Sequence, residues 1–122
     1  MSKKRVLIVD DSALVAKQLA GILEGSGEFE PVGHAQNGLE GIKQFTALKP
    51  DLVLMDLVMP EMDGLQAIRS IVSIDKDARI VVISSAGGVG EKVVEALRFG
   101  AKSVISKPFD PGKVLEVLRM IA

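Results

Sequence analysis

Residues 6–12 have the sequence VLIVDDS, in which four apolar residues are followed by two aspartates and a serine. A continuous run of valine, isoleucine and leucine is typical of a strand that is covered on both faces in a parallel sheet. Two carboxylates at the end of such a strand add nothing to a hydrophobic core, because burying an unpaired charge is costly. We therefore expect a buried strand that delivers Asp10 and Asp11 to one edge of a sheet.

The same arrangement recurs further along the chain. Asp56 follows the apolar run 52–55, and Lys107 follows the short run 104–105 and one serine. The carboxyl ends of neighbouring parallel strands meet at one edge of the sheet, where open α/β sheets bind their ligands. Three carboxylates at one place repel one another, and a divalent cation relieves the repulsion. We therefore expect the three aspartates to hold a metal ion, with Lys107 near enough to contact a phosphate.

Apolar runs and amphipathic segments alternate along the whole sequence. Five strand–helix units predict an α/β fold, a doubly wound five-stranded parallel sheet with helices on both faces. We borrow the strand order 2-1-3-4-5 from known doubly wound sheets, and it makes strands 1, 3, 4 and 5 consecutive neighbours. We expect a single domain over 1–122, with strands at 6–9, 29–35, 52–55, 80–83 and 104–105.

Capping and turn residues predict where the helices begin and end. Ser12 is well placed to cap the first helix, which Gly25 and Gly27 would end. A Lys-Pro pair at 49–50 stops the second helix, because the residue before a proline is driven away from the helical region. Asp63, in an Asp-Gly pair after a tight loop, is expected to start the third helix.

Composition excludes several classes of protein. The chain has 122 residues, of which 48% are hydrophobic, as expected for one globular domain with its own core. The net charge of −1, from 15 basic and 16 acidic residues, argues against a nucleic-acid-binding surface. Cysteine is absent, so thiolate metal sites are excluded. No apolar run approaches the roughly 20 residues of a membrane helix, and we expect a cytoplasmic protein with no membrane partner.

Asp56 is the candidate nucleophile, because carboxylates attack phosphorus in enzymes that form aspartyl-phosphates. Mg²⁺ suits the acidic cluster, since it keeps several waters and binds through one or two carboxylates plus phosphate oxygens. Adjacent residues leaving a strand point in different directions, so we expect at most one of Asp10 and Asp11 to aim straight at the metal. Taken singly, Asp11 or Ser12 could merely cap the first helix, and Asp56 could be a helix cap or part of a loop salt bridge. The combination favours the metal site.

Two further polar positions need an interpretation. A hydroxyl at the end of the fourth strand, from Ser84 or Ser85, could donate to a phosphoryl oxygen. The glycine-rich stretch 87–90 lacks the features of a phosphate-binding loop, and we interpret it as a flexible connector. His34 is the only histidine and has no partner at metal-ligand or triad spacing, so we interpret it as an unremarkable, partly buried residue.

With these motifs in this order, the chain resembles the receiver domain of two-component response regulators, specifically the single-domain, CheY-like chemotaxis regulators with a flavodoxin-like fold. The matching stretches are 6–12, 56–64, 85–86 and 107–109, and the likeness spans nearly the whole chain. The resemblance implies that Asp56 is the phosphoacceptor. It also implies that Mg²⁺ is held by Asp56, directly by Asp11, mainly through water by Asp10, and by the backbone carbonyl of Val58.

The resemblance also implies that Lys107 contacts the phosphoryl oxygens and that Ser85, rather than Ser84, is the switch hydroxyl. The family often has an aromatic residue three positions before this lysine, where this chain has Val104, so we expect motion of the segment 85–90 to carry the signal instead. Side chains two residues after the phosphoacceptor and after the switch hydroxyl influence the lifetime of the phosphate in the family. Here they are Val58 and Gly87, which cannot orient a water, and we expect slow self-dephosphorylation.

The expected function is a signalling switch rather than an enzyme, although it assists its own phosphorylation and dephosphorylation. The expected partners are a histidine kinase or phosphotransfer protein and a downstream target. The target would bind the face formed by the fourth helix, fifth strand and fifth helix, including Lys102, Val104 and Ser106. Chemotaxis, another motility system and a phosphorelay all stay open, as does the choice between a monomer and a dimer that forms on phosphorylation.

Two other classes compete with the signalling switch. A metal-dependent phosphatase with an aspartyl nucleophile needs an Asp-x-Asp pair after the first strand and room for a cap, whereas this pair is adjacent and the chain is short. A flavodoxin-like cofactor carrier needs aromatic residues to stack on a flavin, and this chain has neither Trp nor Tyr.

Overall fold

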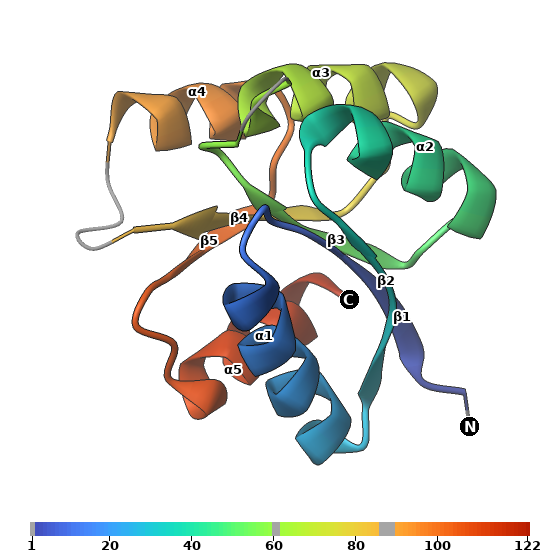
Figure 1. The fold of residues 1–122 in the computed structure, drawn as a ribbon, viewed down its shortest axis with the longest axis vertical. Helices are drawn as coiled ribbons and strands as arrows, with labels where there is room; N and C mark the ends of the chain where they lie inside the picture. Colours follow the sequence, from blue (N-terminus) through green and yellow to red (C-terminus); the bar gives the residue numbers. More distant parts are fainter. Residues whose placement is uncertain (1, 60–61, 86–89) are drawn as a thin grey trace.

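The computed structural model of the protein describes residues 2–59, 62–85 and 90–122. All strand pairs are parallel, and they form one sheet in the order β2-β1-β3-β4-β5 (Figure 1). The predicted fold class and strand order are therefore confirmed. The strands are β1 (Lys4–Val9), β2 (Phe29–Ala35), β3 (Leu52–Asp56), β4 (Ile80–Ser84) and β5 (Ser103–Ser106).

Both faces of the sheet are buried, which explains the continuous apolar runs. Along β1, Val6 and Ile8 pack into one hydrophobic cluster, while Leu7 and Val9 pack into the other. Because successive side chains of a strand point to opposite faces, one short run serves two cores. Helices α1 (Ala13–Ser26) and α5 (Pro111–Ile121) cover one face, and α2 (Gly38–Leu48), α3 (Gly64–Ile74) and α4 (Glu91–Arg98) cover the other (Figure 1).

Side-chain caps start the helices that leave the site strands. The Ser12 hydroxyl accepts a hydrogen bond from the backbone N–H of Val15 at 3.2 Å, which begins α1 directly after the two aspartates. The Asp63 carboxylate accepts from the backbone N–H of Gln66 at 3.0 Å and begins α3. Each cap satisfies a backbone donor that would otherwise lack a partner. Both predicted helix starts are confirmed.

The end of α1 differs from the prediction. Gly27 adopts the left-handed conformation, with φ of 72°, and its N–H donates to the carbonyl of Glu24. Gly25 was also expected to end the helix, but it lies inside it. The reason is that only the residue in the left-handed region closes the helix, and local sequence does not show which of two nearby glycines adopts it. The predicted end of α2 before Pro50 is confirmed, and Lys49, the residue that ends it, also adopts the left-handed conformation.

The strand register sets which residues meet at the carboxyl edge of the sheet. Val9 lies opposite Met55, and Asp56 lies opposite Ile83, so the residues that follow β1 stand beside the end of β3. On the other side of β1, Ile8 lies opposite His34. Within the described part of the chain, no helix has both the length and the apolar character needed to cross a bilayer.

Gly64 lies directly against the backbone of the strand that carries Asp56. A Cβ atom at this position would lie 2.1 Å from the carbonyl oxygen of Asp56 and 2.7 Å from the Cα of Leu57. Because backbone atoms cannot move aside cheaply, we expect Gly64→Ala to lower the free energy of unfolding by about 2 kcal/mol or more. Urea denaturation followed by circular dichroism measures the change.

Gly25→Ala is the matched control for this substitution. A Cβ atom at Gly25 meets nothing within 4 Å, and the residue lies inside α1. Alanine is a better helix former than glycine, so we expect this variant to gain roughly 0.5–1 kcal/mol. A Gly64→Ala protein as stable as the wild type would contradict the proposed close approach of α3 to β3.

Candidate functional site

Three aspartates converge at the carboxyl edge of the sheet. Asp10 and Asp11 directly follow β1, and Asp56 is the last residue of β3. One carboxylate oxygen of each lies within 4.8 Å of the other two. The structure thus brings together the three acidic residues that the sequence indicated, although 45 positions of the chain separate the second from the third.

Both adjacent aspartates contribute an oxygen to this cluster. Side chains alternate in direction only while the chain stays in a strand. Here β1 ends at Val9, and the backbone bends at Asp11 before α1 begins. Because both aspartates stand outside the regular strand, the alternation no longer applies, and each offers an oxygen to the cluster with Asp56.

Asp10 is fully buried, yet among the residues that the structure describes only one of its carboxylate oxygens has a hydrogen-bond partner. Oδ1 accepts a hydrogen bond from the backbone N–H of Ser12 at 2.8 Å. Oδ2 has no hydrogen-bond partner among the described residues, and the ammonium nitrogen of Lys107 lies 3.9 Å from it. A buried carboxylate oxygen without a donor is costly, so this atom is free to bind a cation or a metal-bound water.

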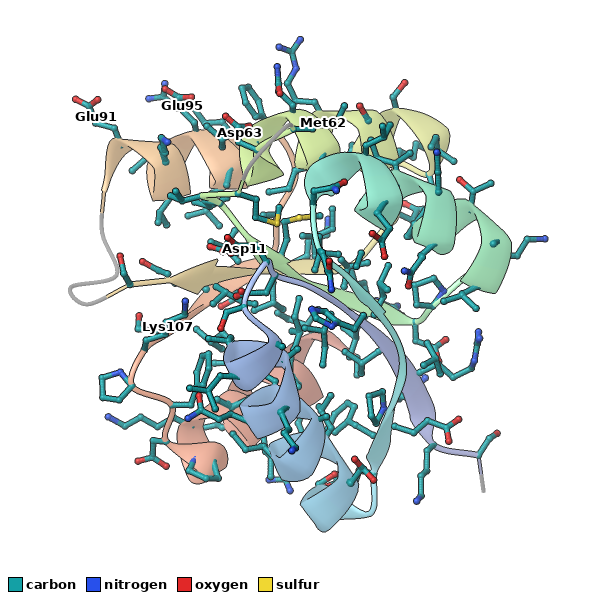
Figure 2. The ribbon with its side chains drawn as sticks, viewed as in Figure 1. Asp11, Met62, Asp63, Glu91, Glu95 and Lys107 are labelled. Carbon is teal, nitrogen blue, oxygen red and sulfur yellow. The ribbon has the colours of Figure 1, made fainter. Side chains whose placement is uncertain are left out.

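Lys107 supplies the positive charge at this edge. Its backbone N–H donates to the carbonyl of Ser84 at 2.9 Å, which continues the pairing of β4 with β5. Its side chain is 34% exposed, so the ammonium group is accessible from solvent. Figure 2 shows Asp11 and Lys107 at the same end of the sheet, while Glu91 and Glu95 on α4 point away from it.

The pKa values of the two buried carboxylates, Asp10 and Asp56, are raised above the ordinary aspartate value. Burial raises the pKa of Asp56 to about 6, and the negative charge of Asp10 raises it as well, against the opposing effects of the Val58 N–H and Lys107. Burial also raises the pKa of Asp10, and the Ser12 N–H and Lys107 oppose this. One lysine therefore does not neutralise the cluster. Clustered carboxylate oxygens, one of them unpartnered, are the ligands that Mg²⁺ prefers, so the residues fit a divalent ion.

The two remaining predicted site residues lie at the exposed rim. The backbone N–H of Val58 donates to Oδ1 of Asp56 at 3.3 Å, while the Val58 side chain is 67% exposed. Ser85 is exposed, and its hydroxyl makes no hydrogen bond with the residues that the structure describes. The Ser84 hydroxyl donates to the Ser85 carbonyl at 3.0 Å, so it is turned to the local backbone.

Two expectations concern residues beyond those just described. Gly87 and most of the segment expected to carry the signal, 85–90, lie outside the described residues, so both expectations stay predictions. Val104, at the position where the family often has an aromatic residue, is half-buried against the core on the α2–α3–α4 side of the sheet.

His34 is the contact that the sequence analysis missed. Its Nε2 atom lies 2.7 Å from the backbone carbonyl oxygen of Asp10. The structure confirms that this histidine is partly buried, and it adds a contact that the sequence analysis did not anticipate, since the side chain reaches the segment that holds the acidic pair. No sequence pattern marks this contact, because it depends on the strand register, which pairs Ile8 with His34 and so brings the imidazole to the end of β1.

Comparison with known proteins agrees with this geometry. The chain matches the response regulator receiver domain over residues 6–119. It is 45% identical over 119 residues to the chemotaxis protein CheY of Thermotoga maritima, and the match covers 98% of each chain. The chain therefore belongs to the response regulator receiver domain family and is a two-component response regulator. The phosphatase alternative is not favoured.

A solved structure and a longer relative extend the comparison. The CheX–CheY–BeF₃–Mg complex of Borrelia burgdorferi has a TM-score of 0.87 at 38% identity, and the match covers 98% of this chain and 90% of that chain. The protein-glutamate methylesterase/protein-glutamine glutaminase 2 of Carboxydothermus hydrogenoformans is 48% identical over 109 residues, or 88% of this chain. The match covers only 30% of that longer protein, so its enzymatic name does not carry over to this chain.

The raised pKa of Asp56 predicts how stability depends on pH. Its pKa of about 6 in the folded protein lies above the ordinary value of 3.8, so the folded state binds the proton more tightly. The resulting stabilisation is fully present below about pH 4 and is lost as the pH rises through about 6. We expect Asp56→Asn to raise the free energy of unfolding of the metal-free protein by about 1–3 kcal/mol at neutral pH, and to change it little near pH 4.

Denaturation of the metal-free protein at the two pH values measures this difference. Asp77→Asn is the matched control, because it removes one negative charge from an exposed residue between α3 and β4. Adding Mg²⁺ at neutral pH should stabilise the wild type more than Asp56→Asn, since the ion relieves the repulsion. An equal gain in both variants would mean that net charge, and not the cluster, determines stability.

Proposed function

We propose that the protein is a chemotaxis or motility switch in which Asp56 accepts a phosphoryl group from a histidine kinase or phosphotransfer protein. The observation that carries the proposal is the cluster of the buried Asp10 and Asp56 and the exposed Asp11, with Lys107 beside it, in a chain of the receiver family. The relatives named chemotaxis protein support the assignment to chemotaxis.

Asp56 is the nucleophile in this proposal. One of its carboxylate oxygens forms a bond to phosphorus while the bond from phosphorus to the imidazole nitrogen of the donor breaks, and that nitrogen keeps the electron pair. The Val58 N–H bonds Oδ1 and orients the carboxylate, which leaves Oδ2 to react. With a pKa of about 6, Asp56 is mostly ionised at neutral pH and therefore nucleophilic.

The neighbouring residues provide charge where the phosphoryl group arrives. The proposed ligands of Mg²⁺ are Asp56, Asp11 and the backbone carbonyl of Val58. Asp10 would bind the ion mainly through water. A bound Mg²⁺ would supply positive charge to the phosphoryl oxygens. The ammonium group of Lys107 lies near one carboxylate oxygen of Asp10, and it would also contact a phosphoryl oxygen. Positioning and electrostatics of this kind supply most of the rate of phosphoryl transfer.

Ser85 is the proposed switch hydroxyl. It stands at the end of β4, exposed and without a hydrogen bond to the described residues, so it is available to donate to a new phosphoryl oxygen. That contact would shift an existing equilibrium of the segment after β4. Because Val104 carries no ring to rearrange, the backbone of this segment, rather than a rotating aromatic side chain, would carry the signal.

The proposed output surface is the α4–β5–α5 face. A groove between β5 and α5 is lined by residues that include Val104, Ser106 and Val117. On α4 the large apolar residues Val94 and Leu97 are 41% and 43% exposed. A downstream target protein would bind here when Asp56 is phosphorylated. We further propose a cytoplasmic monomer that does not turn over a metabolite, with a phosphorylation-dependent dimer as the alternative.

Acetyl phosphate tests the phosphoacceptor directly. With Mg²⁺ present, we expect intact-mass spectrometry to detect one added phosphoryl group on the wild type and none on Asp56→Asn, because only Asp56 offers a reactive carboxylate oxygen at the centre of the cluster. Lys107→Ala should slow the reaction by about 100-fold, since it removes the fixed positive charge. Lys102→Ala, at an exposed lysine just before β5, is the control and should react normally. Labelling of Asp56→Asn at the wild-type rate would refute the proposal.

The lifetime of the phosphate is expected to be long. The side chain two residues after Asp56 is an exposed, apolar Val58, which cannot orient an attacking water. We therefore expect Val58→Asn, which introduces an amide, to accelerate the loss of labelled phosphate several-fold after the donor is removed. Val58→Leu keeps the position apolar and should match the wild type. Equal decay in the asparagine and leucine variants would contradict this explanation.

A further inference from the structure

His34 contacts the backbone of Asp10 from the neighbouring strand. Its Nε2 atom lies 2.7 Å from the Asp10 carbonyl oxygen, and a carbonyl oxygen only accepts, so Nε2 must carry the proton. The backbone N–H of Asp10 also bonds β2, donating to the Ala35 carbonyl at 3.0 Å. Both backbone polar groups of Asp10 are therefore held by β2, one by the regular backbone pairing and the other by a side chain.

This hydrogen bond controls the direction of Asp11. The Asp10 carbonyl belongs to the peptide unit that joins Asp10 to Asp11, and this unit is planar. Fixing its oxygen therefore fixes the direction in which the Cα of Asp11 leaves. Asp11 is exposed, and its carboxylate makes no hydrogen bond with the described residues, so its side chain has little else to hold it towards Asp56.

The backbone of His34 is itself held from α2. The backbone carbonyl of His34 accepts a hydrogen bond from Nε2 of Gln44 at 3.1 Å, and the same Gln44 amide donates to Glu40 at 2.9 Å. The His34 residue is partly buried beneath these contacts. The residue that carries the Nε2–H donor is thus fixed in packed secondary structure.

We propose that His34 is a positioning residue for the metal site, whose Nε2–H orients the Asp10–Asp11 peptide so that both carboxylates face Asp56. This inference rests on the proposed function, since it assigns the residue that prepares the Mg²⁺ site. Without the donor, the Asp10 carbonyl turns towards water, and Asp11 must be ordered again each time the ion binds. Residues that orient metal ligands in this way strengthen binding without touching the ion.

The Mg²⁺ affinity of the apo protein, measured by isothermal titration calorimetry, tests the inference. His34→Phe keeps a ring but removes the donor, and we expect the dissociation constant to rise about 10-fold. His34→Gln restores an N–H donor and should recover most of the affinity, which a purely structural role would not predict. Phe45→Leu, a core change in α2 that leaves the donor in place, is the control and should bind Mg²⁺ as the wild type does.

Nuclear magnetic resonance of the unaltered protein provides a second test that does not depend on folding of a variant. With ¹⁵N-labelled histidine, we expect Nε2 of His34 to be protonated and to show a correlation to the Asp10 carbonyl carbon across the hydrogen bond. A proton on Nδ1 alone would overturn the inference.

Failure of this inference can be told apart from failure of the proposed function. If the wild type binds Mg²⁺ and is phosphorylated on Asp56, but His34→Phe binds Mg²⁺ equally tightly, the role of His34 is refuted and the switch stands. If the wild type neither binds Mg²⁺ nor takes a phosphoryl group from acetyl phosphate, the proposed function is refuted, and the role of His34 with it.

Discussion

The constraint on which this structure depends is the burial of like charges at one edge of a parallel sheet. Asp10 and Asp56 are both buried, and the negative charge of Asp10 raises the cost of ionising Asp56. A protein selected only for stability would replace them with neutral side chains. A site completed by a cation and a phosphoryl group explains why these charges are buried. The charges that destabilise the metal-free protein then bind the cation, and the cation binds the phosphoryl group.

The surrounding fold limits how this edge is built. The alternating apolar residues of β1, β3 and β4 fill two hydrophobic clusters, so the sheet is rigid from both sides. Gly64 lets the start of α3 approach the backbone of Asp56, and Ser12 begins α1 immediately after the acidic pair. The loops that carry the chemistry are therefore short and tied to helix caps. This accounts for how carboxylates from two strands meet at one place.

Much of the fold was predictable because it follows from local patterns. Continuous apolar runs indicate strands buried on both faces, and Ser12 and Asp63 start helices by a side-chain hydrogen bond within four residues. The end of α1 was only half predicted, since Gly25 and Gly27 look alike in sequence and only the backbone conformation separates them. Of the candidate site, the acidic residues were apparent from their positions after strands. His34 was not, because its contact crosses between strands.

The sequence by itself determined the number and type of elements, the residues available for chemistry and the family likeness, because these follow from the order of residue types. Only the tertiary structure decided that Asp10 and Asp11 turn to one place, that Oδ2 of Asp10 has no donor among the described residues, and that His34 holds the Asp10 carbonyl from 24 positions away. Such facts depend on strand register and on where a strand ends. Both are set by the packing of the whole sheet, and no local pattern encodes them.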